Sequence, residues 1–206
     1  MTHTVSTDFA HVYRAGDPDK VTLLLLHGTG GNEHDLVPLS DRVLPGATLL
    51  SPRGQVDEHG HARFFRRLAE GVFDIPDLKA RADALAAWTT AQVRARGAPS
   101  RVVAIGFSNG ANIASAMMFQ HPGLLAGAAL IRAMVPYTLT TTPALHGTRV
   151  LISAGRQDPL VPTAQVATLE QMCRDAGADV TLAWQPGGHG LVAGDLTAMS
   201  QWLATF

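Results

Sequence analysis

The chain has 206 residues, of which 46% are hydrophobic and 16% are charged, and its formal net charge is −1. Length and composition favour one globular domain, residues 1–206, with a core of substantial size. A chain without a basic excess lacks the field that holds nucleic acid or an anionic membrane surface, so neither partner is expected.

The sequence also indicates the cellular setting. Cys173 is the single cysteine, which excludes an internal disulfide and fits a reducing compartment. The first residues show no basic start followed by an apolar segment, and the apolar run at 21–26 is far shorter than the roughly 20 residues that span a bilayer. We therefore expect a cytoplasmic protein without stable membrane insertion, and a homodimer stays open.

Apolar strands and helices are predicted to alternate along the chain. The predicted strands cover 21–26, 47–50, 101–107, 125–131, 149–154 and 179–184. The predicted helices cover 33–43, 77–96, 109–121, 163–176 and 194–204. This alternation indicates an α/β fold with a mostly parallel central sheet and helices on both faces. In such a sheet the ligand site lies beyond the carboxyl ends of the strands, so the loops that follow strands carry the functional residues.

The first of these loops, HGTGGN, follows the strand at 21–26. Its glycines let the backbone turn N–H groups inward, so the loop can supply a donor for a negatively charged oxygen. His27 opens the loop, and we expect its ring nitrogens to brace the loop rather than to act as a catalytic base.

The segment 51–76 is a long insertion with little periodicity, and we interpret it as a lid or pocket loop. Its phenylalanines and two residues further along the chain are candidates for the wall of a pocket that takes a small acyl or aryl ester: Phe64, Phe65, Phe73, Leu160 and Val161. The alternative for the phenylalanines is that they only pack the insertion onto the core.

The insertion also carries titratable side chains. Arg63, Arg66 and Arg67 are expected to form a solvated face, with binding of a substrate carboxylate as the alternative. His59 and His61 are expected to be solvated loop residues. The sequence has neither an HExxH nor a CxxC pattern, so no metal or other cofactor is expected.

The stretch RVVAIGFSNG at 101–110 carries the strongest chemical signal. Ser108 lies between Gly106 and Gly110, in the GxSxG pattern of a nucleophile elbow. The glycines are needed because a Cβ atom at either position would collide with neighbouring backbone at this tight strand-to-helix turn. The backbone N–H of Asn109, at the positive end of the following helix, can stabilise a negatively charged oxygen.

A serine hydroxyl is a weak nucleophile and needs a base, which a carboxylate usually orients. In this type of fold, the acid and then the histidine follow the serine along the chain. His189 is the histidine that follows Ser108 and leaves room for an acid at a strand end, because His121 ends the helix after the serine and His146 lies at the opposite edge of the sheet.

The acid is selected in the same way. Asp158 directly follows the strand at 149–154, at its carboxyl end. Glu170 falls within a helix, and Asp175 and Asp179 flank a turn at the opposite edge of the sheet. Ser108, Asp158 and His189 are therefore predicted to meet at one edge.

Five segments, LLLLHGTGGNEHDLVPL, SPRG, GFSNGANIA, AGRQDPLVP and PGGHG, resemble those of α/β hydrolases of the phospholipase/carboxylesterase family, the small serine esterases. The resemblance runs from about residue 21 to the C-terminus. It implies Ser108 as nucleophile, Asp158 as orienting acid, His189 as base, and the N–H groups of Thr29 and Asn109 as oxyanion donors. Dienelactone hydrolases share this fold but use a cysteine nucleophile, whereas position 108 is serine.

Within that family, the chain most resembles the bacterial subgroup linked to hydroquinone or catechol resistance. Acyl-protein thioesterases usually carry GFSQGG, with glutamine where this chain has Asn109. We therefore expect a carboxylesterase that hydrolyses small acyl or aryl esters through an acyl-enzyme. The alternatives are an acyl-thioesterase or lysophospholipase and, from another class, a ligand-binding or stress-response protein with low turnover.

Overall fold

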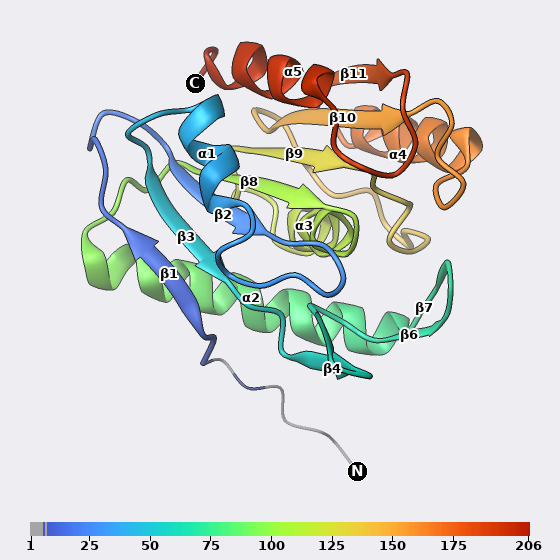
Figure 1. Ribbon diagram of the computed structural model, residues 1–206, viewed down its shortest axis with the longest axis horizontal. Helices are drawn as coiled ribbons and strands as arrows, with labels where there is room; N and C mark the ends of the chain where they lie inside the picture. Colours follow the sequence, from blue (N-terminus) through green and yellow to red (C-terminus); the bar gives the residue numbers. More distant parts are fainter. Residues whose placement is uncertain (1–5, 7) are drawn as a thin grey trace.

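Long apolar segments form the strands of the central sheet. The computed structural model describes residue 6 and residues 8–206, and within them the sheet contains β1 (His11–Arg14), β2 (Thr22–Leu26), β3 (Thr48–Pro52), β8 (Val102–Phe107), β9 (Gly127–Ile131), β10 (Arg149–Gly155) and β11 (Asp179–Gln185). Their order across the sheet is β1-β3-β2-β8-β9-β10-β11 (Figure 1). The six strands expected from the sequence are all present.

The pairing makes the sheet mostly parallel. β1 pairs with β3 in antiparallel register, and each of the other neighbouring pairs is parallel. β1 was not predicted, because its residues HVYR are only partly buried and form no apolar run. The carboxyl ends of the parallel strands consequently meet at one edge.

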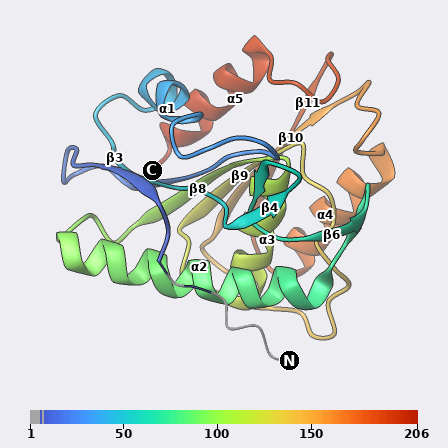
Figure 2. The ribbon, with the colours of Figure 1, turned by 60° about the horizontal axis from the view of Figure 1, so that its bottom comes forward.

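Helices cover both faces of the sheet, as predicted. They are α1 (Val37–Val43), α2 (Ile75–Arg96), α3 (Asn109–Gln120), α4 (Thr163–Asp175) and α5 (Ala193–Leu203). Figure 2 shows α2, α3 and α4 below the sheet and α1 and α5 above it. α1 begins at Val37 instead of 33, with Pro38 in its first turn, where a missing N–H costs no helical hydrogen bond.

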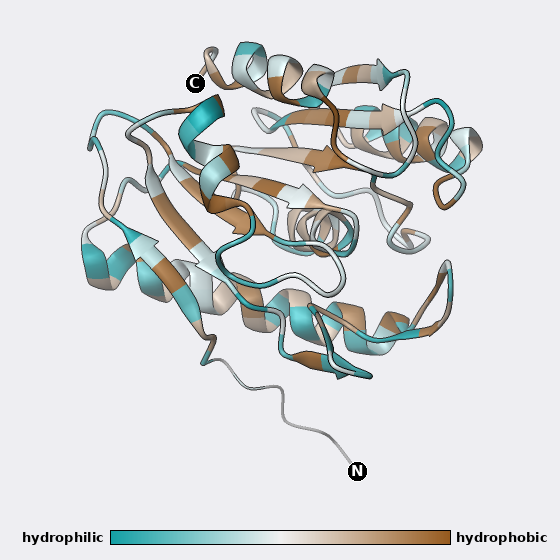
Figure 3. Ribbon diagram, viewed as in Figure 1, coloured by the Kyte–Doolittle hydropathy of each residue, from teal (hydrophilic) through white to brown (hydrophobic). Residues whose placement is uncertain are grey.

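Two apolar cores lie on either side of the sheet. One packs α2, α3 and α4 against alternate strand residues such as Leu24 and Ala104, and the other packs α1 and α5 against residues such as Leu23 and Val103. Figure 3 shows the apolar strands between helices of mixed character.

Across the described residues, no helix combines the length and the apolar character needed to cross a membrane.

The insertion 51–76 contains two small hairpins. β4 (Val56–Glu58) pairs with β5 (His61–Arg63), and β6 (Arg67–Ala69) pairs with β7 (Val72–Phe73). In Figure 1 the β6–β7 hairpin lies on the side toward which β8, β9 and β10 point. The insertion therefore stands beside the carboxyl edge of the sheet, where the functional loops meet.

Candidate active site

Ser108 occupies a strained turn between β8 and α3. Its φ of 52° lies in the left-handed region, which side chains other than glycine rarely adopt. A Cβ atom on Gly106 would come within 2.5 Å of the carbonyl oxygen of Gly110, and one on Gly110 would overlap the carbonyl oxygen of Leu26. The Ser108 N–H donates to the Ile131 carbonyl at 2.8 Å. Glycine at both positions is thus a steric requirement of the turn.

Three side chains form a hydrogen-bonded row at this edge. His189 Nε2 lies 2.9 Å from Ser108 Oγ, and His189 Nδ1 lies 2.8 Å from Asp158 Oδ2. The other carboxylate oxygen of Asp158 accepts the N–H groups of Leu160 and Val161 at 2.8 and 3.2 Å. A neutral imidazole that donates its Nδ1–H to Asp158 presents an unprotonated Nε2 to the serine hydroxyl. The row can therefore remove the hydroxyl proton.

The two predicted oxyanion residues line the same cavity as Ser108. Asn109 is the first residue of α3, and the first N–H groups of a helix have no acceptor within it and carry partial positive charge. Thr29 is held in place because its Oγ1 accepts from Arg63 Nη1 at 2.6 Å. Thr29 on its loop and Asn109 at the start of α3 therefore both lie at the wall of the cavity that Ser108 lines.

His27 braces the loop that carries Thr29, as the sequence predicts. Its Nδ1 lies 2.7 Å from the Gly28 carbonyl oxygen, and its Nε2 accepts the Gly54 N–H at 2.9 Å. Burial is the main cause that lowers the pKa of His27 and keeps the ring neutral. The ring joins the loop to the start of the insertion.

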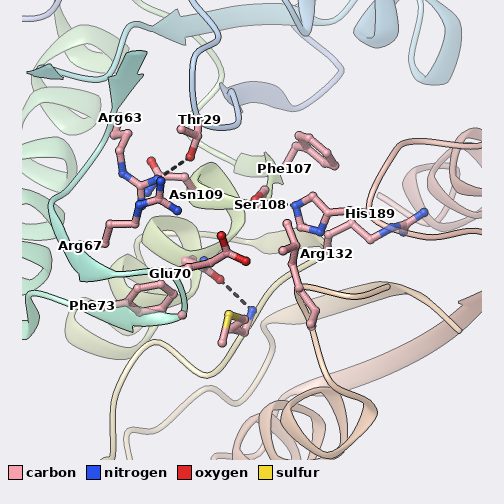
Figure 4. A pocket seen from close by; sticks show the side chains of 15 residues that line it. Thr29, Arg63, Arg67, Glu70, Phe73, Phe107, Ser108, Asn109, Arg132 and His189 are labelled. Carbon is pink, nitrogen blue, oxygen red and sulfur yellow. Dashed lines mark hydrogen bonds between the residues drawn. The ribbon is translucent and has the colours of Figure 1, made fainter. Parts of the chain in front are cut away.

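A cavity of about 220 Å³ opens beside Ser108 (Figure 4). Phe73, Leu160 and Val161 line it, as predicted. Phe64 and Phe65 do not, because they are 2% and 0% exposed and belong to the core. Phe64 packs against the His27 ring and Phe65 against Phe73, and full burial of their apolar surface stabilises the fold. The pocket prediction is therefore wrong for these two residues, which instead pack the insertion onto the core.

Several lining residues were not singled out in the sequence. They are Phe107, Asn112, Arg132, Met134, Glu70 and Gly71. Phe107 belongs to the elbow motif, and Arg132 and Met134 follow β9 directly, so position after a strand was the signal that could have identified them.

The arginines of the insertion separate into two environments. Arg63 is 3% exposed, which contradicts the expectation of a solvated face for this residue, whereas Arg67 is partly exposed and lines the cavity with it. Arg67 Nε donates to Glu58 at 2.9 Å, and Arg63 lies 3.6 Å from the same carboxylate. Arg66 is exposed and pairs with Asp74 outside the cavity.

The first hairpin is tied to the elbow and its neighbouring loop. Asn109 Oδ1 accepts the Phe64 N–H at 2.7 Å, and the Ala62 carbonyl accepts the Gly30 N–H at 2.9 Å. The Asn109 Nδ2 atom is buried and finds no acceptor among the described residues.

His59 and His61 are exposed, and the described part of the chain contains no cluster of three or more groups suited to a metal ion.

Comparisons with known proteins identify the family and the fold of this chain. Residues 53–198 match the model of the dienelactone hydrolase family. The Bacillus subtilis protein named "Putative hydrolase MhqD" is 45% identical over 93% of this chain and 96% of its own length. The crystal structure of a Bacillus cereus carboxylesterase has a TM-score of 0.92 at 42% identity, over 94% of this chain and 92% of that one. A carboxylesterase from Mesorhizobium loti has a TM-score of 0.88 at 35% identity, over 93% of both chains.

Proposed function

This chain belongs to the dienelactone hydrolase family of α/β hydrolases, and we propose that it is a serine carboxylesterase acting on small acyl or aryl esters. The sequence contrasts Ser108 with the cysteine nucleophile of dienelactone hydrolases, but the family model matches residues 53–198 of this chain, which include Ser108. A serine at this position therefore does not separate the chain from that family. The observation that carries the proposal is the row from Ser108 through His189 to Asp158, with contacts of 2.9 and 2.8 Å, at the wall of a cavity.

The proposed reaction has two steps. His189 Nε2 takes the proton of Ser108 as Oγ attacks the ester carbonyl, and the N–H groups of Thr29 and Asn109 stabilise the oxyanion. The imidazolium then protonates the leaving alcohol, and an acyl-enzyme remains. Water, deprotonated by His189, attacks the acyl-enzyme and releases the acid and the free serine. The buried Asp158 carboxylate holds the ring in the required tautomer.

The cavity favours a small substrate. Its volume of about 220 Å³ is below the roughly 300–1,000 Å³ of sites for drug-sized ligands. Phe73, Phe107 and Met134 contribute apolar surface to its wall. The charges of Arg63 and Arg67 are balanced by Glu58, which lies close to both, and by Glu70 in the lining, so a neutral ester is favoured.

An acyl series tests the size limit. We expect kcat/KM for p-nitrophenyl palmitate to be at least about tenfold below that for the butyrate, because each methylene that does not fit costs binding in the transition state. Oxygen esters and thioesters of equal acyl length are compared in the same experiment. A palmitoyl preference in either series would favour the thioesterase or lysophospholipase alternative.

Labelling and substitution test the nucleophile. We expect a fluorophosphonate probe to label Ser108, and Ser108→Ala to lower the turnover of p-nitrophenyl acetate by roughly four to six orders of magnitude. Ser100→Ala, at an exposed serine far from the cavity lining, is the matched control and should behave as the wild type. Absence of labelling, or equal turnover in Ser108→Ala, would contradict the proposed function and favour a low-turnover binding protein.

A further inference from the structure

Arg132 is a buried arginine at the cavity whose donors are all used within the protein. It follows β9 directly, is 1% exposed, and has a φ of 57°. A guanidinium has five N–H donors. Nε donates to the Gly188 carbonyl at 2.9 Å; Nη1 donates to the Ser153 carbonyl at 3.1 Å and to Asp195 at 2.9 Å; Nη2 donates to the Gly190 carbonyl and to Asp195, both at 2.9 Å. No donor remains for a substrate.

Asp195 fixes the Arg132 guanidinium through a buried ion pair. This carboxylate is 0% exposed and pairs with Arg132 through both oxygens. It also accepts the Ser153 hydroxyl at 2.6 Å and the Val192 N–H at 2.8 Å, so four donors hold it at the start of α5. A bidentate pair with this many additional bonds has a single geometry.

Two of the three carbonyls that Arg132 binds belong to the residues on either side of His189. Gly188 and Gly190 have no side chain that could anchor the loop by packing. The position of the histidine backbone therefore depends on hydrogen bonds to its neighbours. From this geometry we propose that Arg132, fixed by Asp195, is a positioning residue that holds His189 within reach of Ser108 and Asp158. The inference rests on the proposed function, in which His189 is the base.

The arrangement predicts an effect on turnover rather than on binding. Arg132 offers no free donor to a substrate, so its loss should leave KM nearly unchanged. A shift of His189 by a fraction of its 2.9 Å contact with Ser108 would slow proton transfer. Misplacement of a reacting group by about 1 Å can cost about 10²-fold in rate.

The experiment compares Arg132→Met, Arg132→Lys and the control Arg81→Met. Arg81 pairs with Asp77 in α2 and does not line the cavity, so its variant loses a partly buried ion pair elsewhere. With p-nitrophenyl acetate we expect Arg132→Met to lower kcat about 10²-fold with KM within about threefold of wild type. The kcat of Arg132→Lys, which has three donors instead of five, should lie between those of Arg132→Met and the wild type. Arg81→Met should keep the wild-type kcat.

Two further measurements separate positioning from general damage. Millimolar guanidinium should raise the kcat of Arg132→Ala, because it can occupy the space that the truncated side chain leaves and bind the same carbonyls and carboxylate, while methylammonium should not. The double variant Arg132→Met with Asp195→Leu replaces the ion pair by apolar side chains, a change that buried pairs often tolerate without loss of stability. We expect it to fold and to show the same loss of kcat as the single variant.

The outcomes distinguish the inference from the function on which it rests. Turnover that does not depend on Ser108 would overturn the proposed function. Amide hydrogen exchange at 187–190 would then still test whether Arg132 holds the loop that carries His189. We expect faster exchange in Arg132→Met and not in Arg81→Met. A folded Arg132→Met or double variant with kcat within about threefold of wild type, unchanged exchange, or an equal loss in Arg81→Met would overturn the role of Arg132.

Discussion

At the scale of single residues, the side chains that bond to distant backbone are the ones that the sequence did not reveal. The elbow, Asp158 and His189 follow strands in a fixed order, so motif and order were sufficient to predict their meeting. The sequence indicates a catalytic use for the backbone N–H of Asn109 but no partner for its side chain, which accepts the Phe64 N–H, 45 positions earlier in the chain. The position of Arg132 directly after β9 could have marked it as a site residue, but nothing in the sequence indicates its partners at 188, 190 and 195. Such partners depend on the folded chain path, which no local pattern encodes.

His27 gives a residue-scale prediction about pH. Its folded pKa is lowered by burial, so the unfolded chain binds a proton more readily, and the stability that depends on the neutral ring is present above the unfolded pKa and lost as pH falls below about 6.5. We expect the free energy of unfolding to fall by up to about 1.4 kcal/mol per pH unit from this group in that range. Urea denaturation between pH 5 and 7.5 measures it.

The control for His27 is His27→Gln, which can accept the Gly54 N–H but does not titrate. Other histidines and carboxylates contribute equally to both proteins, so the difference between the two pH profiles isolates His27. Parallel profiles would contradict the assignment of the acid sensitivity to this ring.

At the scale of elements, length decided what could be predicted. The buried strands are continuous apolar runs, the helices between them are longer segments, and the bounds of both differ from the predictions by a few residues at most, except at the start of α1. The hairpins β4–β5 and β6–β7 have strands of two or three residues, which are too short for a period to appear. Contacts with the elbow and the neighbouring loop hold the first hairpin, so its structure follows from tertiary packing.

The turn of the β6–β7 hairpin gives an element-scale prediction. Glu70 lines the cavity, as Arg67 of the same hairpin does, and is exposed. In Glu70→Gln the arginines lose part of their compensation, so the kcat/KM for mono-p-nitrophenyl succinate relative to the acetate should rise about threefold, in line with exposed charge pairs worth about 0.2–1 kcal/mol. Glu170→Gln in α4 makes the same change in net charge away from the cavity and should leave this ratio unchanged. If the succinate-to-acetate ratio of kcat/KM is the same in Glu70→Gln and Glu170→Gln, the charges that line the cavity do not influence the choice of substrate.

At the scale of the whole molecule, the apolar patterning that defined the sheet also determines which groups are hidden from solvent. The two cores enclose the strands from both sides, and α4 buries its inner face against one of them. The α/β architecture with a mostly parallel sheet could be predicted because strands buried on both faces are continuously apolar and alternate with helices, whereas the hydrolase family was implied by the resemblance of the loop motifs. The edge strand β1 lacked that signature because only part of each of its residues is covered.

Cys173 reports on the integrity of this packing. The thiol is 0% exposed, and burial raises its pKa to about 12, so at pH 8 it should react with DTNB only when the chain unfolds. We expect iodoacetamide to leave esterase activity intact, and the rate of DTNB reaction to rise with urea along the unfolding curve. Rapid stoichiometric labelling of the folded protein with loss of activity would contradict both the burial and the role of Ser108 as nucleophile.

The ion pair of Arg132 and Asp195 has a consequence for protein synthesis. Ser108 and its elbow leave the ribosome long before α5, which carries the carboxylate that fixes the guanidinium. Under the proposed role of Arg132, a nascent chain can fold its elbow and expose the serine while the histidine loop is still unanchored. Hydrolytic competence then arrives late in translation, once residue 195 has been added and packed, so an incomplete chain carries a nucleophile without a working base.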